Sequence, residues 1–203
     1  MRSAVGLVIV TAALATTLTA CVGAEPYHEV LDEAAHRGPS ADRERFESAR
    51  DAVAGALDVS PAQLAINRMN ASPEHVTVLA SPATEPLWDQ WNVRGLDDAS
   101  NIGPYPTDAV DGWFVLSDVP ALDRIGELYD EALALRGVAP GEMAVDLAVS
   151  CAPPRATDAH AMSPTGDPPG MPPHCAPEIA FTFSDPRRTV ERVTFDADGE
   201  LVQ

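Results

Sequence analysis

The chain contains no lysine, although it is 203 residues long and carries 31 aspartate and glutamate residues. All thirteen basic residues are arginine, and the formal net charge is −18 at pH 7. A surface with this balance repels nucleic acids and anionic lipid headgroups. We therefore expect no nucleic-acid partner. The acidity is otherwise typical of a solvated protein surface, and the missing lysine is consistent with codon bias, so neither feature selects a ligand.

Signatures of common catalytic sites are also absent. The sequence contains no Gly-x-Ser-x-Gly, no His-Glu-x-x-His and no glycine-rich phosphate loop. None of the five histidines has the spacing of a metal ligand with another. His75 could act with Asp89 or Ser72, but a surface histidine at a strand end explains it as well. The carboxylates allow an acid–base pair, yet nothing in the sequence selects one. We expect neither an enzyme nor a bound cofactor or metal.

The first notable feature that is present is an apolar N-terminal run. Residues 1–3 give a short basic start, and residues 4–20 carry no charge. The run ends in Leu18-Thr19-Ala20-Cys21, where small residues precede a cysteine as in a secretory signal. A membrane-spanning helix needs about 20 apolar residues. This run is a little short, rich in alanine and threonine, and lacks a basic stop after it. A transmembrane anchor or a plain signal remains the alternative interpretation.

The ending of that run resembles the lipobox of bacterial lipoproteins. In such proteins the cysteine thiol receives a diacylglycerol with fatty acyl groups such as palmitate, and the signal is cleaved before the cysteine. The resemblance implies a signal peptide over residues 1–20 and a lipid on Cys21. It implies attachment to the outer, extracytoplasmic face of the cell membrane. Residues 21–39 then form a tether, expected as a flexible spacer, with a short helix over residues 25–36 as the alternative.

Cys151 and Cys175 remain once Cys21 is assigned to lipid. A cysteine pair in an exported protein is most simply a disulfide. The bridge would close a proline-rich loop over residues 151–175, and the chain-entropy model assigns it a stabilisation of roughly 3.5 kcal/mol. The alternative is a metal site that uses both cysteines with His160 and His174, but its spacing is irregular.

Two segments of the chain match other segments at fixed offsets, which indicates an internal repeat. Residues 59–67 align with residues 138–146 at an offset of 79. Residues 73–78 align with residues 177–182 at an offset of 104. The difference between the offsets is an insertion of 25 residues in the second copy, which corresponds to the loop between the two cysteines. We therefore predict tandem copies, the first over 40–118 and the second over 119–203.

Each copy predicts a helix followed by three strands and a short fourth one. The predicted fold class is α+β: two tandem α-β-β-β(-β) repeats, an antiparallel sheet, and one helix per repeat packed on a face. Helical spacing of apolar residues places helices over residues 41–57 and 121–135. Alternation of apolar and polar residues places strands in both copies. They are expected over residues 64–70, 76–80, 87–94, 143–149, 178–183 and 189–195, with short fourth strands over 113–116 and 200–202.

Two tryptophans are candidate contacts for a partner. Trp88 aligns with Arg192 in the second copy and lies three residues from Trp91, hence on the opposite face of the strand. An aromatic residue that its counterpart lacks is a candidate binding contact. The alternative is that Trp88 packs under residues 82–86. Trp113 is open to the same two interpretations.

The copies and the lipobox together resemble uncharacterised actinobacterial lipoproteins. The shared features are a strand ending in glycine, here residues 88–95, and the segment Trp113 to Val119 that leads into a helix. More distantly, the layout is similar to that of β-lactamase-inhibitor-protein-like and PepSY-type modules, which bind proteins or inhibit peptidases across a sheet face. The resemblance implies a lipid-anchored binding or scaffold protein that presents its sheet to a protein or cell-envelope partner. A carrier of an apolar ligand and a membrane-tethered hydrolase are the alternatives.

Overall fold

The computed structural model describes residues 42–95, 98–139, 143–152, 170–185 and 188–202. These residues form two α-helices and an antiparallel sheet of seven strands in the order β4-β3-β2-β1-β5-β6-β7. The α+β class and the antiparallel sheet predicted from the sequence are therefore confirmed. The elements are α2 (Arg43–Ala56), β1 (Leu64–Ala71), β2 (Val76–Pro82), β3 (Asp89–Arg94), β4 (Asp98–Pro104), α3 (Ile125–Arg136), β5 (Ala144–Cys151), β6 (Pro177–Asp185) and β7 (Arg188–Asp196).

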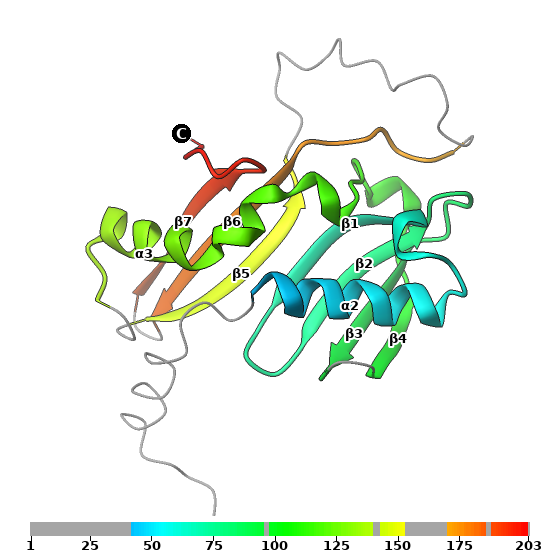
Figure 1. Cartoon of the computed structure of the whole chain (residues 1–203), viewed down its shortest axis with the longest axis horizontal. Helices are drawn as coiled ribbons and strands as arrows, with labels where there is room; N and C mark the ends of the chain where they lie inside the picture. The colour runs from blue at the N-terminus through cyan, green and yellow to red at the C-terminus, as the bar shows by residue number, and fades with distance from the viewer. Residues whose placement is uncertain (1–41, 96–97, 140–142, 153–169, 186–187, 203) are drawn as a thin grey trace, which may run out of the picture.

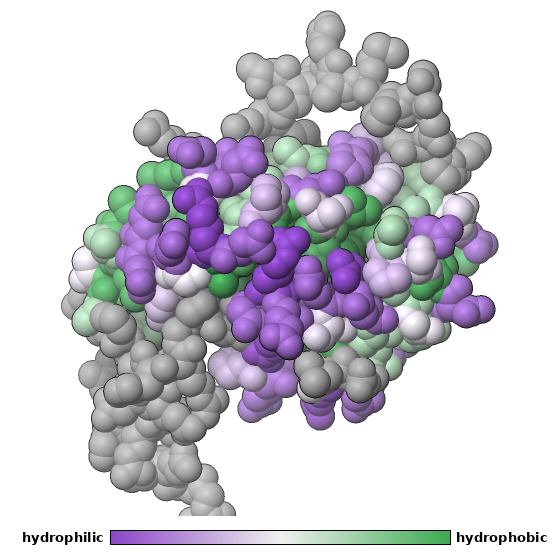
Figure 2. Space-filling view, viewed as in Figure 1, coloured by the Kyte–Doolittle hydropathy of each residue, from purple (hydrophilic) through white to green (hydrophobic). Residues whose placement is uncertain are grey.

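Both helices pack on the same face of the sheet, which gives the molecule two layers (Figure 1). α2 lies over the strands β1 to β4, and α3 lies over β5 to β7. The ring of Phe181 lies 5.9 Å from that of Tyr129 on α3 and 6.0 Å from that of Phe195, measured between centroids. The space-filling view from the same side shows hydrophilic side chains over the outward surface of the helical layer (Figure 2). The apolar sides of the helices are therefore turned to the sheet.

The start of α2 follows from a capping residue and an amphipathic pattern. The side chain of Asp42 accepts a hydrogen bond from the Arg45 backbone N–H at 2.9 Å, which satisfies one of the free donors of the first turn. Phe46, Ala49 and Val53 recur at helical spacing and are fully buried against the sheet. The helix predicted over residues 41–57 is therefore present with nearly the expected bounds.

The second helix begins later than the spacing predicts. Residues 120–124 form a 3₁₀-helix rather than the first turn of α3. Here the Ala121 backbone N–H donates to the carbonyl of Ala197 at 3.0 Å, a partner outside the helix. α3 ends at Gly137, whose φ of 63° is the left-handed conformation that glycine adopts most readily.

The strands follow the apolar alternation closely. In β5, Leu147 and Val149 are fully buried in the core, while Ala148 and Ser150 face the other side of the sheet. The six strands that carry such a pattern lie within two residues of their predicted bounds at each end.

The fourth strand of the first half is not where the sequence predicts it. Residues 113–116 form only isolated bridges, Phe114 with Ile66 and Trp113 with His174. The fourth strand is instead β4, which pairs with β3 at the edge of the sheet. The prediction is wrong because β4 contributes Ala99 to the core while most of its other residues are exposed. An edge strand of this kind leaves little apolar periodicity to detect.

The two halves of the chain meet in the middle of the sheet. β1 pairs antiparallel with β5, with Arg68 opposite Ser150 and Ala71 opposite Leu147. From this central pair the strands run outward in chain order on both sides. The side chains at the β1–β5 junction therefore come from residues about 80 positions apart in the sequence.

Several predictions concern parts of the chain outside the described residues. These parts are the signal peptide (1–20), Cys21, the tether (21–39), and residues 153–169 of the loop between the cysteines, including His160. Within the described ranges, no helix is long and apolar enough to cross a membrane.

Candidate functional site

The side of the sheet opposite the helices carries a row of small, uncharged side chains that crosses every strand. We call this side the polar face. Successive residues of a strand point to opposite faces, and Met69 and Val149, next to two members of the row, are buried in the core. In register from edge to edge, the row consists of Ser100, Asn92, Thr77, Asn70, Ala148, Ala180 and Thr194.

Charged residues flank this row in the middle of the polar face. On one side, Arg68 of β1 lies opposite Ser150 of β5, which lies opposite Glu178 of β6. On the other side, Arg192 of β7 lies opposite Thr182 of β6. The two arginines therefore stand on strands that are separated by β5 and β6.

Part of the polar face is covered by a second, smaller apolar cluster. Its buried members are Ala65, Leu79, Trp88 and Val110, with Tyr105, Trp113 and Met171 packed around them. These residues come from β1, β2, the segment before β3, the chain that follows β4 and, for Met171, the segment before β6. The cover closes the polar face over part of β1 and β2 and leaves the region over β5 to β7 outside the cluster.

Beside this cover, the polar face is hollowed. The hollow has a volume of about 410 Å³ and extends from the segment after β4 to β7. We call it the polar hollow. Tyr105 and Asp111 line it on the side of the cover, and Arg192 lines it from β7. Arg68, Asn70 and Ser150 also line it, with Ala148, Thr182, Asn67, Ala109 and Cys151.

Arg68 and Arg192 have no side-chain partner among the described residues, in contrast to Arg43, Arg50 and Arg136. Arg68 is half-buried and Arg192 is exposed. Neither guanidinium group makes a hydrogen bond or ion pair within the part of the chain that the structure describes. Elsewhere, Arg50 pairs with Asp51 and Arg136 with Glu191.

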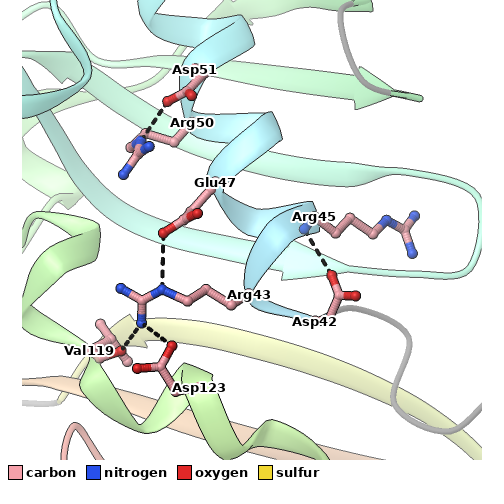
Figure 3. A network of polar contacts seen from close by, with 8 residues as sticks. All are labelled: Asp42, Arg43, Arg45, Glu47, Arg50, Asp51, Val119 and Asp123. Atoms are coloured by element: carbon pink, nitrogen blue, oxygen red, sulfur yellow. Dashed lines mark hydrogen bonds and ion pairs between the residues drawn. The ribbon is translucent and has the colours of Figure 1, made fainter.

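The network at the start of α2 illustrates the contrast (Figure 3). There Arg43 contacts Glu47, Asp123 and the Val119 carbonyl, and Arg45 donates to the Pro73 carbonyl at 3.2 Å. Carboxylates outnumber arginines by more than two to one in the sequence. Two unpaired guanidinium groups around one hollow therefore give it a local positive charge on a chain that is acidic overall.

The wall of the hollow on the side of Asp111 is held by hydrogen bonds. The Asn67 side-chain amide donates to the Gly112 carbonyl at 2.8 Å and to Asp111 Oδ1 at 3.4 Å. Asn67 lies at the bulge of β1 between Ile66 and Arg68. The bulge turns Asn67 toward the segment after β4 and so ties that segment to the sheet next to Arg68.

Trp88, predicted as a possible binding contact, lies inside the small apolar cluster. Only 1% of its surface is exposed, and it packs with Leu79 and Val110. Its indole Nε1 has no hydrogen-bond partner among the described residues. This placement matches the alternative in which Trp88 packs within the fold. A direct contact with a partner stays a prediction.

Trp113 is half-buried at the edge of the same cluster and contacts the segment that returns from the cysteine loop. Its ring lies 4.8 Å from that of His174 in an edge-on arrangement. Its backbone N–H donates to Pro173, and its carbonyl accepts from Cys175 at 2.8 Å. Its role as a binding contact also stays a prediction.

Cys151 and Cys175 form a disulfide, with 2.01 Å between the sulfur atoms and 5.5 Å between the Cα atoms. The bond joins the end of β5 to the chain just before β6, as the sequence predicts. His174 Nε2 lies 3.0 Å from Asp118 Oδ2 rather than beside the sulfurs. The described residues contain no group of three side chains that could hold a metal ion. With the two sulfurs bonded to each other, the cysteines are not free thiolates for the alternative metal site, and its His160 lies outside the described residues.

His75 forms a local contact and no catalytic pair with Asp89. Its Nδ1 lies 3.2 Å from the Ser72 hydroxyl, in the turn between β1 and β2. No hydrogen bond or ion pair joins His75 to Asp89 in the described ranges.

The polar hollow was not predicted from the sequence. The alternation of Arg68 with the apolar Met69 in one strand indicates that Arg68 points away from the core. The sequence does not show that β1 lies near β7, so it does not predict the hollow.

Comparison of the chain with known protein families, with curated proteins and with solved structures found no match. The polar face and its hollow are therefore the features of this chain that bear on its function.

Proposed function

We propose that this protein is a lipid-anchored, extracytoplasmic binding or scaffold protein without a catalytic site, which presents the polar face to a protein or cell-envelope partner. The observation that carries the proposal is the asymmetry of the sheet. Both helices cover one face, and the other offers a row of small side chains across seven strands beside the polar hollow. Five of the seven residues of the row carry a hydroxyl or amide group, which suits a partner bound through polar contacts and bridging waters.

The chemistry of the hollow favours binding of a polar group over the two alternatives. Its lining includes arginine, asparagine, aspartate and hydroxyl side chains, so it does not suit an apolar ligand. Ser150 and Thr182 supply hydroxyl groups, but His75 and His174 are not among the lining residues. A hydroxyl nucleophile needs an adjacent base, and the lining offers no such histidine.

We propose further that the two halves are tandem copies, with boundaries near 40–118 and 119–203. Two features support this: the fixed-offset matches in the sequence, and the order of one helix followed by antiparallel strands in each half. In this view the β1–β5 pair joins equivalent first strands of the two copies into one sheet.

The proposed anchor is a lipid on Cys21. A net charge of −18 disfavours binding to anionic headgroups, so attachment would depend on acyl chains. Each buried methylene of an acyl chain contributes about 0.8 kcal/mol. The disulfide supports an oxidising compartment outside the cytoplasm.

The anchor is tested by replacing Cys21 with alanine in the full chain. We expect the variant to lose labelled palmitate and to leave the membrane fraction or remain uncleaved. The matched control replaces both Cys151 and Cys175 with serine, which removes thiols of the folded domain and should leave the label in place. A processed Cys21→Ala protein that stays on the membrane would refute the anchor.

The binding face is tested by photo-crosslinking in intact cells. A photo-reactive phenylalanine analogue is placed at Asn70 or Thr194 on the polar face, and at Glu127 or Glu131 on the exposed side of α3 as the control. We expect discrete adducts, identified by mass spectrometry, from the polar-face positions alone. Equal adducts at all four positions, or adducts from α3 alone, would overturn the proposal.

A further inference from the structure

We propose that the polar hollow holds a carboxylate side chain of the partner protein between Arg68 and Arg192. This inference rests on the proposed binding function and specifies which chemical group is recognised. It assigns the two guanidinium groups a common ligand, an aspartate or glutamate within a segment that lies across the polar face.

Both arginines line the same hollow, from strands that two others separate. Neighbouring strands lie about 4.8 Å apart, so the backbones of β1 and β7 are about 14 Å apart across β5 and β6. Arg68 is in register with Ser150, whereas Arg192 is in register with Thr182 and Asp146, so the two arginines are also offset by four residues, about 13 Å, along the strands. The floor between them is low, because Ala148, Ser150 and Thr182 line the hollow there with short side chains. Both arginines line the hollow from opposite corners of this floor, so a ligand between them is reached by two extended side chains.

The charge balance favours an anion at this place. The half-buried Arg68 has lost part of its hydration without gaining a partner among the described residues. A carboxylate would compensate that loss, because guanidinium groups bind carboxylates through paired, charge-assisted hydrogen bonds.

The surrounding charges favour one carboxylate over a more highly charged group. The chain has a net charge of −18, which repels extended polyanions such as nucleic acids and anionic membranes. Asp111 also lines the hollow and is exposed, so its carboxylate repels a doubly charged phosphate more than a singly charged ligand. The expected partner therefore carries an isolated carboxylate on a segment that is otherwise neutral or basic.

The position of the hollow favours a side chain over a chain end. The hollow lies in the middle of the sheet, and the row of small side chains continues past it to both edges. An internal segment of a partner that follows this row, beside the cover, can therefore place a side chain into the hollow. Asn70 and Ser150 stand beside Arg68 with groups that can bind the backbone of such a segment.

The test uses the full chain, purified from membranes in detergent and labelled with ¹⁵N at arginine Nε, and nuclear magnetic resonance of the Nε–H signals. Arg68→Gln and Arg192→Gln variants assign the two signals. The probe is acetyl-Ala-Glu-Ala-amide, with acetyl-Ala-Gln-Ala-amide as its uncharged match. We expect the glutamate peptide to shift both arginine signals and the glutamine peptide to shift neither.

The variants give the expected size of the effect. A hydrogen bond to a charged group contributes enough that losing either arginine should weaken binding of the glutamate peptide about tenfold or more. The control variant is Arg94→Gln, an exposed arginine near the end of β3 that does not line the hollow. It should bind the peptide like the natural protein.

Two further ligands separate the sources of an anion. Acetyl-Ala-Ala-Ala with a free carboxyl end tests a chain terminus, and inorganic phosphate tests a phosphate group. Stronger binding of either ligand than of the glutamate peptide would overturn the inference. The absence of a shift at Arg68 and Arg192, or an equal shift with the glutamine peptide, would also overturn it.

The same variants distinguish this inference from the proposed function. Adducts from Thr194 in cells that persist in the Arg68→Gln/Arg192→Gln variant would keep the binding function and overturn the carboxylate site. Peptide binding that needs both arginines, in a protein whose polar face gives no adduct in cells, would keep the carboxylate site and overturn the proposed function.

Discussion

Arg43 at the start of α2 forms an ion pair with Asp123 in the 3₁₀-helix that leads into α3, with 3.2 Å between Nη1 and Oδ1. The same guanidinium contacts Glu47 Oε1 at 2.9 Å and donates to the Val119 carbonyl at 3.4 Å (Figure 3). One cation therefore joins the helix of the first half to the entrance of the helix of the second half.

Replacement of Arg43 by glutamine should lower the free energy of unfolding by about 1 kcal/mol. Ion pairs between partly exposed groups contribute about 0.2–1 kcal/mol each, and this residue also loses a contact to a backbone carbonyl. Urea unfolding of the full chain, followed by tryptophan fluorescence, measures the change. Arg50→Gln is the control, because Arg50 contacts only the adjacent Asp51 in the network drawn, and its loss should change little. Equal effects of the two variants would contradict a linking role for Arg43.

Gly112 leaves no room for a side chain beside the disulfide. A Cβ atom at this position would lie 2.8 Å from Cys175 Cβ, 3.1 Å from Cys151 Sγ and 3.3 Å from the Pro173 carbonyl oxygen. These neighbours belong to a cross-linked segment that cannot move aside easily. We expect Gly112→Ala to lower the free energy of unfolding by about 1–3 kcal/mol, as overpacking does elsewhere.

The matched change is Gly126→Ala in α3. A Cβ atom there meets nothing within 4 Å, and replacing glycine by alanine at a compatible backbone position stabilises a protein by about 0.4–1 kcal/mol, because it restricts the unfolded chain. Thermal or urea unfolding of both variants should therefore give changes of opposite sign. A Gly112→Ala protein as stable as the natural one would contradict the prediction. It would show that the segment after β4 can shift away from the disulfide and make room for the methyl group.

The fold was predictable where burial imposes a pattern and unpredictable where it does not. Phe46 and Val53 on α2, and Leu147 and Val149 on β5, repeat with the period of their element because one side of each faces the core. β4 lies at the edge with most residues exposed, so its sequence carries no comparable signal.

The polar hollow was unpredictable for a different reason. Arg68 and Arg192 occupy ordinary polar positions of their strands, and only the order β1-β5-β6-β7 brings them to one hollow. Strand order depends on which edges pair, and local alternation does not encode that choice. The cover over Trp88 likewise depends on the path of residues 105–113, which lack a periodic pattern.

Ser81 holds the turn before β3 through buried hydrogen bonds. Its side chain is fully buried, its hydroxyl donates to the Glu85 carbonyl at 2.6 Å, and it accepts from the Leu87 backbone N–H at 2.9 Å. Ser81→Ala would leave both backbone groups without this partner, and such a loss costs about 1–3 kcal/mol.

We expect the Ser81→Ala protein to unfold at lower urea and to show altered emission from the neighbouring Trp88. Ser117→Ala is the control, because Ser117 is exposed. If both variants unfold at the same urea concentration, water replaces the Ser81 hydroxyl and the turn does not depend on it.

Tyr129 should make stability fall at alkaline pH. It is 6% exposed between α3 and the sheet, and burial, with Asp130 as the smaller cause, raises the pKa of its phenol above the usual value of 10. Above pH 10 the unfolded chain therefore releases this proton before the folded chain does. Unfolding becomes more favourable as the pH rises from about 10 through the raised pKa of the folded chain. Below pH 10 the contribution of Tyr129 to stability is fully present.

The Tyr129→Phe variant lacks this source of alkaline destabilisation. Its free energy of unfolding, measured by urea from pH 8 to pH 11, should therefore fall less than that of the natural protein. Parallel pH profiles for the two proteins would show that Tyr129 ionises equally in the folded and unfolded chain.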